Sequence, residues 1–265
     1  ARSHIRVFGY NDVAASNDLL IPLAKGKVIT DPTKLNNSDW HSSIMYFMMV
    51  DRFVDGDTSN NKPVNDPAIL AKAQYYGGDI KGITQKIKAG YFQDLGINTI
   101  WISPITQNPI DAWGQFNNPD TKFSGYHGYW PITSTSVDYR LGNSADVKEM
   151  LRTAHSNGLS VLLDYVANHV HEQHAVYQKH KDWVTPLYLP NGTMNTEKWD
   201  EHRLTTWFDT FLPTLDLEKQ EVTDFMVDSA IYWITEYDFD GFRHDATKHI
   251  PNNFWRTLNK KVKKI

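Results

Sequence analysis

The chain has 265 residues, of which 40% are hydrophobic and 22% charged, a balance that predicts a folded domain with a sizeable core. Its 27 Lys and Arg against 31 Asp and Glu give a formal charge of −4 without a basic stripe, which excludes a typical nucleic-acid surface. The absence of cysteine excludes disulfides and thiol chemistry, and no apolar run is long enough to predict a membrane span. Aromatic residues make up 13% of the chain, and core packing and sugar recognition explain this load equally well.

The first segment of the chain, residues 1–39, is poorly periodic and rich in Asn, Asp, Ser and Pro. Only the runs Ile5–Phe8 and Leu19–Leu23 have strand character. We predict that this segment is a linker or the tail of a preceding domain. There is no initiator Met and no signal-peptide core, and the Lys-rich end at Ile265 lies inside an uncapped helical pattern, so we expect a piece of a longer protein.

From Ser43 onward, strand patterns alternate four times with helix patterns. The continuous apolar run Ile44–Val50 indicates a strand buried on both faces. The other predicted strands are Asn98–Ile102, Ser160–Asp164 and Phe239–Asp245, and the predicted helices are 80–95, a helix from Asn143 or Ser144 to Asn157, 222–234 and 252–265. This alternation predicts an α/β fold with a parallel sheet, the N-terminal half of a (β/α)8 barrel.

About 50 residues separate the third strand from the next helix, which is too long for a plain loop. We predict a small inserted subdomain over residues 166–215, so that residues 40–165 and 216–265 form the barrel half. Four β/α units leave two sheet edges and an apolar face uncovered. We therefore expect the native protein to continue past Ile265.

The fourth predicted strand carries the first candidate for chemistry. Its two-residue period places Phe239, Gly241, Arg243 and Asp245 on one face. An arginine beside a carboxylate keeps it ionised, and an ionised, oriented carboxylate can attack an anomeric carbon. On strand position alone, a structural ion pair between Arg243 and Asp245 is the better interpretation.

Four motifs in this order change that balance: Gly125–Trp130, Asp164–His169, Leu212–Asp216 and Gly241–His249. Together they resemble the signature regions of the α-amylase family of glycoside hydrolases, and the resemblance covers about Ser43 to Ile265. It implies that Asp245 is the nucleophile that forms a covalent glycosyl intermediate. It also implies that Arg243 holds this nucleophile and that Asp164 braces the arginine.

The same resemblance assigns five residues to substrate binding. His127 and His169 match histidines that hydrogen-bond sugar hydroxyls, and Tyr129 matches an aromatic platform beneath the same sugar. Lys248 and His249 match residues that line the leaving-group side. Taken one at a time, these histidines are more often structural, and their position in a motif outweighs that interpretation.

Retaining hydrolysis also needs a second carboxylic acid, about 5 Å from the nucleophile and with a raised pKa. In the family this glutamate follows the fifth strand, which would lie beyond Ile265. We therefore expect the chain as given to lack hydrolytic activity on its own.

A second cluster of oxygen-bearing side chains occupies residues 55–61. Hard cations prefer such ligands, although a solvated Asx-rich turn is the usual alternative. The segment resembles the N-terminal calcium loop of cyclodextrin glucanotransferases and related amylases. The ligands that this implies for Ca²⁺ are the side chains of Asp55, Asp57, Asn60, Asn61 and Asp79 and the carbonyl of Gly77.

The family's other calcium site uses an asparagine that matches Asn168 and a carbonyl that matches His249. Its aspartate is replaced here by Thr214, whose neutral hydroxyl is a poorer ligand, which puts this site in doubt. The four histidines between residues 169 and 180 fit no zinc-binding spacing.

The sequence thus predicts a retaining glycoside hydrolase that cleaves α-1,4-glucosidic bonds of starch-like α-glucans, in an extracytoplasmic location. The alternatives are a transglycosylase that makes cyclodextrins and a non-catalytic, amylase-like glucan-binding protein. The Leu212–Asp216 string differs from the one typical of oligo-1,6-glucosidases, which argues against that branch. The oligomeric state is not indicated.

Overall fold

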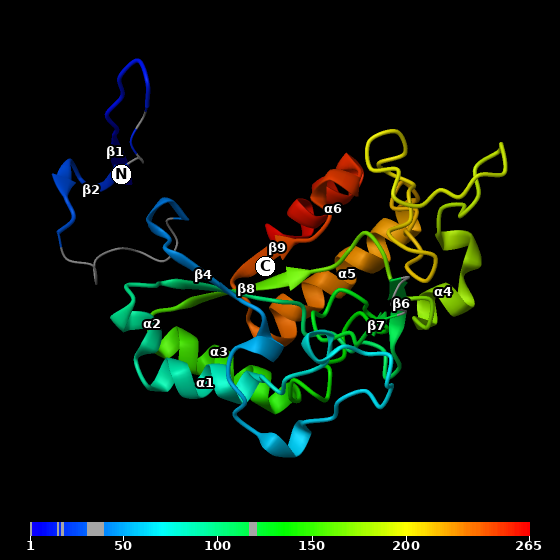
Figure 1. Ribbon diagram of the computed structural model, residues 1–265. Helices are drawn as coiled ribbons and strands as arrows, with labels where there is room; N and C mark the ends of the chain where they lie inside the picture. The colour runs from blue at the N-terminus through cyan, green and yellow to red at the C-terminus, as the bar shows by residue number, and fades with distance from the viewer. Residues whose placement is uncertain (1, 15, 17–18, 31–39, 117–120) are drawn as a thin grey trace.

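A parallel sheet of four strands forms the centre of the protein (Figure 1). The computed structural model describes residues 2–14, 16, 19–30, 40–116 and 121–265. The sheet is ordered β4 (Met45–Met48), β5 (Thr99–Ile102), β8 (Ser160–Tyr165) and β9 (Gly241–His244). Each strand pairs in parallel with the next one along the chain, as the alternation of strand and helix patterns predicts.

Helices cover one side of this sheet, and Figure 1 shows α1, α3 and α5 along it. The helices are α1 (Ile80–Lys88), α2 (Tyr91–Asp94), α3 (Ser144–Ser156), α4 (Ala175–Lys179), α5 (Gln220–Tyr237) and α6 (Asn252–Val262). The single helix predicted over 80–95 is wrong, because the chain turns at Gly90 with φ +77° and begins α2 there. The last helix ends at Val262 rather than at Ile265.

The start of α3 confirms its predicted cap. Asn143 accepts hydrogen bonds from Ala145 N and Asp146 N, and the Asp146 side chain accepts in return from Asn143 N. This reciprocal capping satisfies amide groups that have no partner inside the helix. It fixes the point at which the chain enters α3, between β5 and β8.

The four strands differ in how far they are buried. All six residues of β8 are buried, whereas Met45 and Phe47 of β4 are 46% and 43% exposed. The prediction that the first strand is buried on both faces is therefore wrong, because β4 is an edge strand and only alternate residues such as Tyr46 pack against helix side chains like Phe92. Phe239 also departs from its predicted face, since it precedes β9 and packs near Trp233 of α5.

Three smaller regions lie outside the central sheet. The two strands predicted in the N-terminal segment are confirmed as an antiparallel sheet of β1 (Arg2–Val7), β2 (Leu19–Ala24) and β3 (Lys27–Val28). A short hairpin after β5, β6 (Trp113–Phe116) and β7 (Thr121–Phe123), has no counterpart in the sequence prediction.

The long segment between β8 and α5 holds α4 and several isolated β-bridges, such as His169 with Thr214 and Val184 with Leu215. In Figure 1 it extends beyond the ends of β8 and β9. Its bounds as a subdomain, 166–215, stay a prediction, as does the linker role of residues 1–39. In the parts of the chain that the structure describes, no helix is long and apolar enough to cross a membrane.

Candidate active site

Three charged residues meet at the carboxyl ends of β8 and β9. Arg243 Nη1 donates to Asp164 Oδ1 and Oδ2 at 3.0 and 3.1 Å and to Asp245 Oδ1 at 3.0 Å. The pairing of β8 with β9 sets Arg243 directly opposite Asp164, and Asp245 follows the strand on the same side. One guanidinium therefore bridges the two carboxylates, as the strand period predicts.

Asp164 is the enclosed member of this cluster. Its Oδ2 also accepts hydrogen bonds from the Tyr129 hydroxyl at 2.8 Å and from Trp101 Nε1 at 3.1 Å. Burial raises the pKa of Asp164, while the hydrogen bond from Tyr129 and the positive charge of Arg243 act in the opposite direction. The role of Trp101 was missed in the sequence, although its place in β5, facing the same side as Asp164, was a usable signal.

The two carboxylates differ in access to solvent. The Asp164 side chain is 0% exposed and the Asp245 side chain is 19% exposed. Asp245 N donates to Tyr165 O at 3.1 Å, which anchors the backbone just past the end of β9. Only one Asp245 oxygen is bonded to Arg243, so the other, Oδ2, is available to a substrate. This arrangement suits Asp245 for nucleophilic attack and Asp164 for support.

His127 and Tyr129 stand side by side in the loop after β5, with their rings stacked at 5.8 Å between centroids. His127 Nδ1 accepts a hydrogen bond from Tyr129 N at 3.0 Å. Burial, with smaller contributions from His169 and Arg52, lowers the pKa of His127 to about 4, so the ring is neutral at pH 7. Since Nδ1 accepts, Nε2 carries the proton and can donate to a sugar hydroxyl.

His169 lies close to the same loop. Its Nε2 donates to Tyr129 O at 3.0 Å, and its ring packs near Phe208 with centroids 4.9 Å apart. Burial lowers the pKa of His169, which favours the neutral ring. The structure thus brings His127, Tyr129 and His169 together around the carboxylate cluster, as the motifs predict.

Lys248 and His249 are held by the inserted segment instead. Lys248 Nζ forms an ion pair with Asp200, and Arg203 Nη1 donates to Lys248 O at 2.7 Å. His249 Nδ1 lies 2.6 Å from Arg203 O, and its ring packs near Phe208 at 5.1 Å between centroids. These two predicted leaving-group residues therefore border the insertion, and their partners Asp200 and Arg203 were not predicted from the sequence.

The predicted calcium loop folds around Asp79. The Asp79 carboxylate accepts from Gly82 N and Asp57 N, both at 2.7 Å, and from Asn60 Nδ2 at 3.2 Å. Asn61 Nδ2 donates to Asp55 Oδ2 at 2.7 Å in the same loop. The Asp57 carboxylate is already bonded elsewhere, because Ser59 Oγ donates to its Oδ1 and Lys81 Nζ donates to its Oδ2.

Two oxygen atoms of this loop have no donor. Asn60 Oδ1 and Asn61 Oδ1 are buried without a hydrogen-bond partner, an arrangement that costs free energy unless a further group binds there. Gly77 packs tightly against Asn61, since a Cβ on Gly77 would lie 2.5 Å from Asn61 Oδ1. A cavity of about 160 Å³ beside Asn61 and Gly77 is also lined by Lys62 and Arg140 and by none of the other predicted ligands, so it does not mark the position of an ion. Apart from Asp57, the predicted ligands fit a hard cation such as Ca²⁺.

The second family calcium site, which the sequence put in doubt, stays untested. Asn168 is buried, and neither its Oδ1 nor its Nδ2 has a partner among the described residues. Thr214, which stands where the family has an aspartate, donates its hydroxyl proton to Thr206 O at 2.7 Å and offers a neutral oxygen, a poorer ligand than a carboxylate. Within the described parts of the chain, no group of three or more His, Asp or Glu side chains gathers as a metal cluster.

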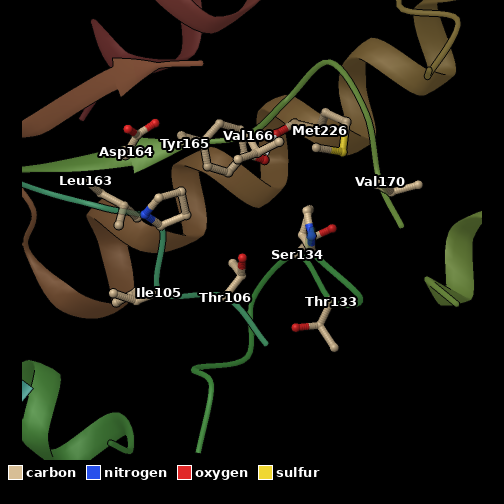
Figure 2. A pocket seen from close by; sticks show the side chains of 12 residues that line it. Ile105, Thr106, Thr133, Ser134, Leu163, Asp164, Tyr165, Val166, Val170 and Met226 are labelled. Carbon is tan, nitrogen blue, oxygen red and sulfur yellow. Dashed lines mark hydrogen bonds between the residues drawn. The ribbon is translucent and has the colours of Figure 1, made fainter. Parts of the chain in front are cut away.

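A small cavity lies on the other side of β8 (Figure 2). It is lined among others by Ile105, Thr106, Ser134 and Met226, and Figure 2 shows the carboxylate of Asp164 pointing away from these residues. Its volume is about 10 Å³, room for about one water molecule. The cavity is therefore too small for a sugar and is not part of the carboxylate cluster.

Comparison with known proteins agrees with this site. Residues 47–264 match the sequence profile described as "Alpha amylase, catalytic domain". The chain is 33% identical over 236 residues to a cyclomaltodextrin glucanotransferase of Klebsiella oxytoca, covering 82% of this chain and 34% of that protein. It is 30% identical to a cyclomaltodextrinase of Thermoanaerobacter pseudethanolicus, covering 85% of this chain and 38% of that protein. The chain thus spans about a third of the length of these curated relatives.

Solved structures give the same result. An α-amylase from Geobacillus thermoleovorans, complexed with acarbose, matches with a TM-score of 0.66 and 36% identity over 85% of this chain and 44% of that one. An Anoxybacillus α-amylase matches with a TM-score of 0.69 and 32% identity over 85% and 45%. These similarities support the (β/α)8 barrel fold class, to which the four parallel strands and their helices conform. The chain belongs to the α-amylase family.

Proposed function

We propose that this chain carries the nucleophile side of an active site that acts on α-glucans, with Asp245 as the nucleophile. The observation that carries the proposal is the bridge from Arg243 to both carboxylates, at 3.0 Å to Asp164 and 3.0 Å to Asp245. It aims the accessible carboxylate of Asp245 through one oxygen and leaves the other oxygen open to substrate. Relatives named α-amylase, cyclomaltodextrinase and cyclomaltodextrin glucanotransferase support the substrate class.

The proposed reaction begins when a carboxylate oxygen of Asp245 bonds to the anomeric carbon of the sugar while the glycosidic C–O bond breaks. The leaving oxygen takes a proton from a carboxylic acid, a role that we assign to no residue of this chain. Arg243 fixes the attacking carboxylate, and the neutral ring of His127 orients a sugar hydroxyl. His169, whose Nε2 donates to Tyr129 O and whose Nδ1 is buried, would join it only by releasing that bond. A water molecule or the hydroxyl of a second glucan then displaces Asp245 and releases the product.

Calcium is part of the proposal as a structural ion. Asp55, Asn60, Asn61 and Asp79, with the carbonyl of Gly77, would hold it, and Asp57 would join only if it leaves Lys81. When bound, the ion supplies positive charge to the two buried amide oxygens that have no donor. We propose no ion at Asn168.

The direct test replaces Asp245 with Asn in the intact enzyme that contains this chain and measures turnover of starch. We expect turnover to fall by about three orders of magnitude or more, because the amide cannot form the glycosyl ester. Asp238→Asn is the matched control, since this residue is 89% exposed and lies at the end of α5. Unchanged turnover of Asp245→Asn would refute the nucleophile assignment.

The acceptor in the second step decides between hydrolysis and transglycosylation. The similarity to cyclomaltodextrin glucanotransferases keeps transglycosylation as the second candidate. Product analysis on maltoheptaose separates the two, because cyclic or longer glucans appear only when a sugar displaces Asp245. Linear shorter products alone would establish the hydrolase, cleaving α-1,4 bonds.

We also propose an extracytoplasmic location. A relative named periplasmic alpha-amylase, from Escherichia coli, is 26% identical over 83% of this chain. Polymeric α-glucans outside the cell would suit an enzyme in that compartment. Fractionation of the source cells tests the proposal, and activity confined to the cytoplasm would contradict it.

A further inference from the structure

Arg52 lies between two tyrosine rings beside the candidate sugar site. Its Cζ is 3.9 Å from the ring centroid of Tyr76 and 3.9 Å from that of Tyr126. A planar guanidinium between two aromatic faces is attracted to both of them, and the attraction depends on parallel contact that a lysine cannot reproduce. The stack therefore connects two loops that are 50 residues apart in the sequence.

The guanidinium is fixed in this position by the segment that precedes Tyr76. Arg52 Nη2 donates to Gln74 O at 2.7 Å and to Lys72 O at 3.2 Å. Its Nε lies 2.8 Å from Asp51 Oδ2, a close ion pair. Asp51 is buried and in turn accepts from Tyr76 N at 3.0 Å and from Gly77 N at 3.2 Å. Arg52 and Asp51 thus hold residues 72–77 as one unit.

Each end of the stack touches a region with a proposed role. On one side Tyr76 precedes Gly77, which packs so closely on Asn61 that a Cβ would lie 2.5 Å from Asn61 Oδ1. On the other side Tyr126 precedes His127, and their rings are 5.3 Å apart. Contacts therefore run without a break from the unpaired oxygen of Asn61 to the histidine of the sugar site.

We propose that Arg52 is a positioning residue that couples the cation loop to the sugar-binding loop. This inference rests on the proposed calcium site. An ion bound to the Gly77 carbonyl and to Asn61 restricts the motion of residues 72–77, to which Arg52 is hydrogen-bonded. Because Arg52 also stacks on Tyr126, the motion of the neighbouring His127 is restricted as well. The coupling is reciprocal, so a sugar held by His127 strengthens binding of the ion by the same factor.

The test is amide hydrogen exchange of the intact enzyme that contains this chain, with and without added Ca²⁺, followed in peptides that cover residues 55–61 and 121–131. In the wild type we expect Ca²⁺ to slow exchange in both peptides, by about fivefold or more in the second, at the low end of typical coupling strengths. Arg52→Gln should keep the slowing in 55–61 and lose it in 121–131. Arg152→Gln, on a residue whose side chain is 75% exposed on α3, should behave as the wild type.

Two further variants guard against a folding defect in Arg52→Gln. Tyr126→Leu removes one ring and leaves the bonds of Arg52 to residues 72–74 in place, and it should also lose the slowing in 121–131. Arg52→Lys keeps the charge without the planar stack and should show less than half of the wild-type slowing in residues 121–131. Because the readout is exchange at a distant loop, a merely structural arginine would not produce this pattern.

The outcomes separate the coupling from the site on which it rests. Slowing of residues 121–131 by Ca²⁺ that persists in both Arg52→Gln and Tyr126→Leu would overturn the coupling and leave the calcium site standing. No slowing of residues 55–61 in the wild type would overturn the calcium site and the coupling together. If Arg52→Gln and Tyr126→Leu lose the slowing in residues 121–131 and keep the slowing in residues 55–61, the result supports both the calcium site and the coupling.

Discussion

The protein has two clusters of acidic residues that solve the problem of buried charge in different ways. At the end of the sheet, Asp164 and Asp245 share Arg243, and Asp164 has further donors in Tyr129 and Trp101. In the loop of residues 55–61, backbone amides satisfy Asp79, but two amide oxygens are buried without any donor. Among the described residues the first cluster is complete, whereas in the second Lys81 pairs with Asp57 and leaves Asn60 Oδ1 and Asn61 Oδ1 without a donor.

This difference separates two kinds of function. A complete cluster holds a fixed geometry with no added ligand, which is what a reacting carboxylate requires. An incomplete cluster gains free energy only when something binds, which is typical of a structural ion site. The motifs assign different roles to the two clusters, and the hydrogen-bond partners in the structure show which carboxylates and amides are satisfied.

The largest expected effect comes from removing the positive charge of the complete cluster. Arg243→Met should lower kcat/KM of the intact enzyme by about 10²- to 10³-fold, because Asp245 loses the donor that aims it. Arg152→Met, on the exposed side of α3, should leave kcat/KM unchanged. A loss of less than tenfold in Arg243→Met would show that the cluster does not depend on its internal cation.

An intermediate effect is expected from adding Ca²⁺ to the incomplete cluster. At a concentration of about 100 times its Kd, the ion should raise the free energy of unfolding by about 2.7 kcal/mol, since it binds only the folded loop. Asn61→Leu should abolish this gain, because it removes a proposed ligand oxygen. It also removes the hydrogen bond from Asn61 Nδ2 to Asp55 Oδ2, so the gain is compared within each protein, with Ca²⁺ and without. Denaturant unfolding with Ca²⁺ and with a chelator measures both quantities. Equal gains in wild type and variant would refute the site.

A smaller effect is expected in the pH dependence of the free energy of unfolding, which differs between the two regions. Burial lowers the pKa of His127 near the sheet end, and of His244 on β9, to about 4. The unfolded chain then binds more protons than the folded one between about pH 6.5 and 4, so stability falls as the pH falls through that window. Each histidine contributes up to about 1.4 kcal/mol per pH unit. In the loop, the hydrogen bond from Lys81 lowers the pKa of Asp57 to about 2, so that carboxylate stays charged throughout.

His244→Phe tests this pH dependence without touching the carboxylates. The ring of His244 packs near Trp255 at 4.8 Å, and its Nδ1 is buried without a partner, so phenylalanine suits the site. The free energy of unfolding, measured in urea at pH 7 and at pH 5, should fall less in the variant than in the wild type. The same fall in both proteins would contradict the assignment of a low pKa to His244.

Much of the fold and part of the site could be predicted from the sequence. The strands, the order of the parallel sheet and the Arg243–Asp245 contact follow from periodicity and from the two-residue alternation of a strand. The exposure of Phe47 agrees with the apolar face that four β/α units leave uncovered, which the strand prediction for Ile44–Val50 did not take into account. The break at Gly90 was visible as a glycine, but its positive φ was not.

The missed contacts are all between residues far apart in the chain. Trp101 reaches Asp164 only because β5 and β8 are neighbours, and Arg52 meets Tyr126 across 74 positions. The partner of Asp57 was equally hidden, since Lys81 lies on the first turn of α1 and takes the carboxylate that the motif assigns to calcium. Motifs indicate which residues matter, and tertiary packing decides what each of them contacts.

The central claim is that Asp245 forms a covalent bond with the sugar while Asp164 does not. The most direct test traps the intermediate in the intact enzyme with a fluorinated α-glucosyl fluoride, which forms the glycosyl ester and hydrolyses slowly, and then locates the added mass in protease-generated peptides. The account predicts a glucosyl mass on the peptide that contains residues 241–249, assigned by fragmentation to Asp245. A label on Asp164, or full inactivation with no label on Asp245, would contradict it.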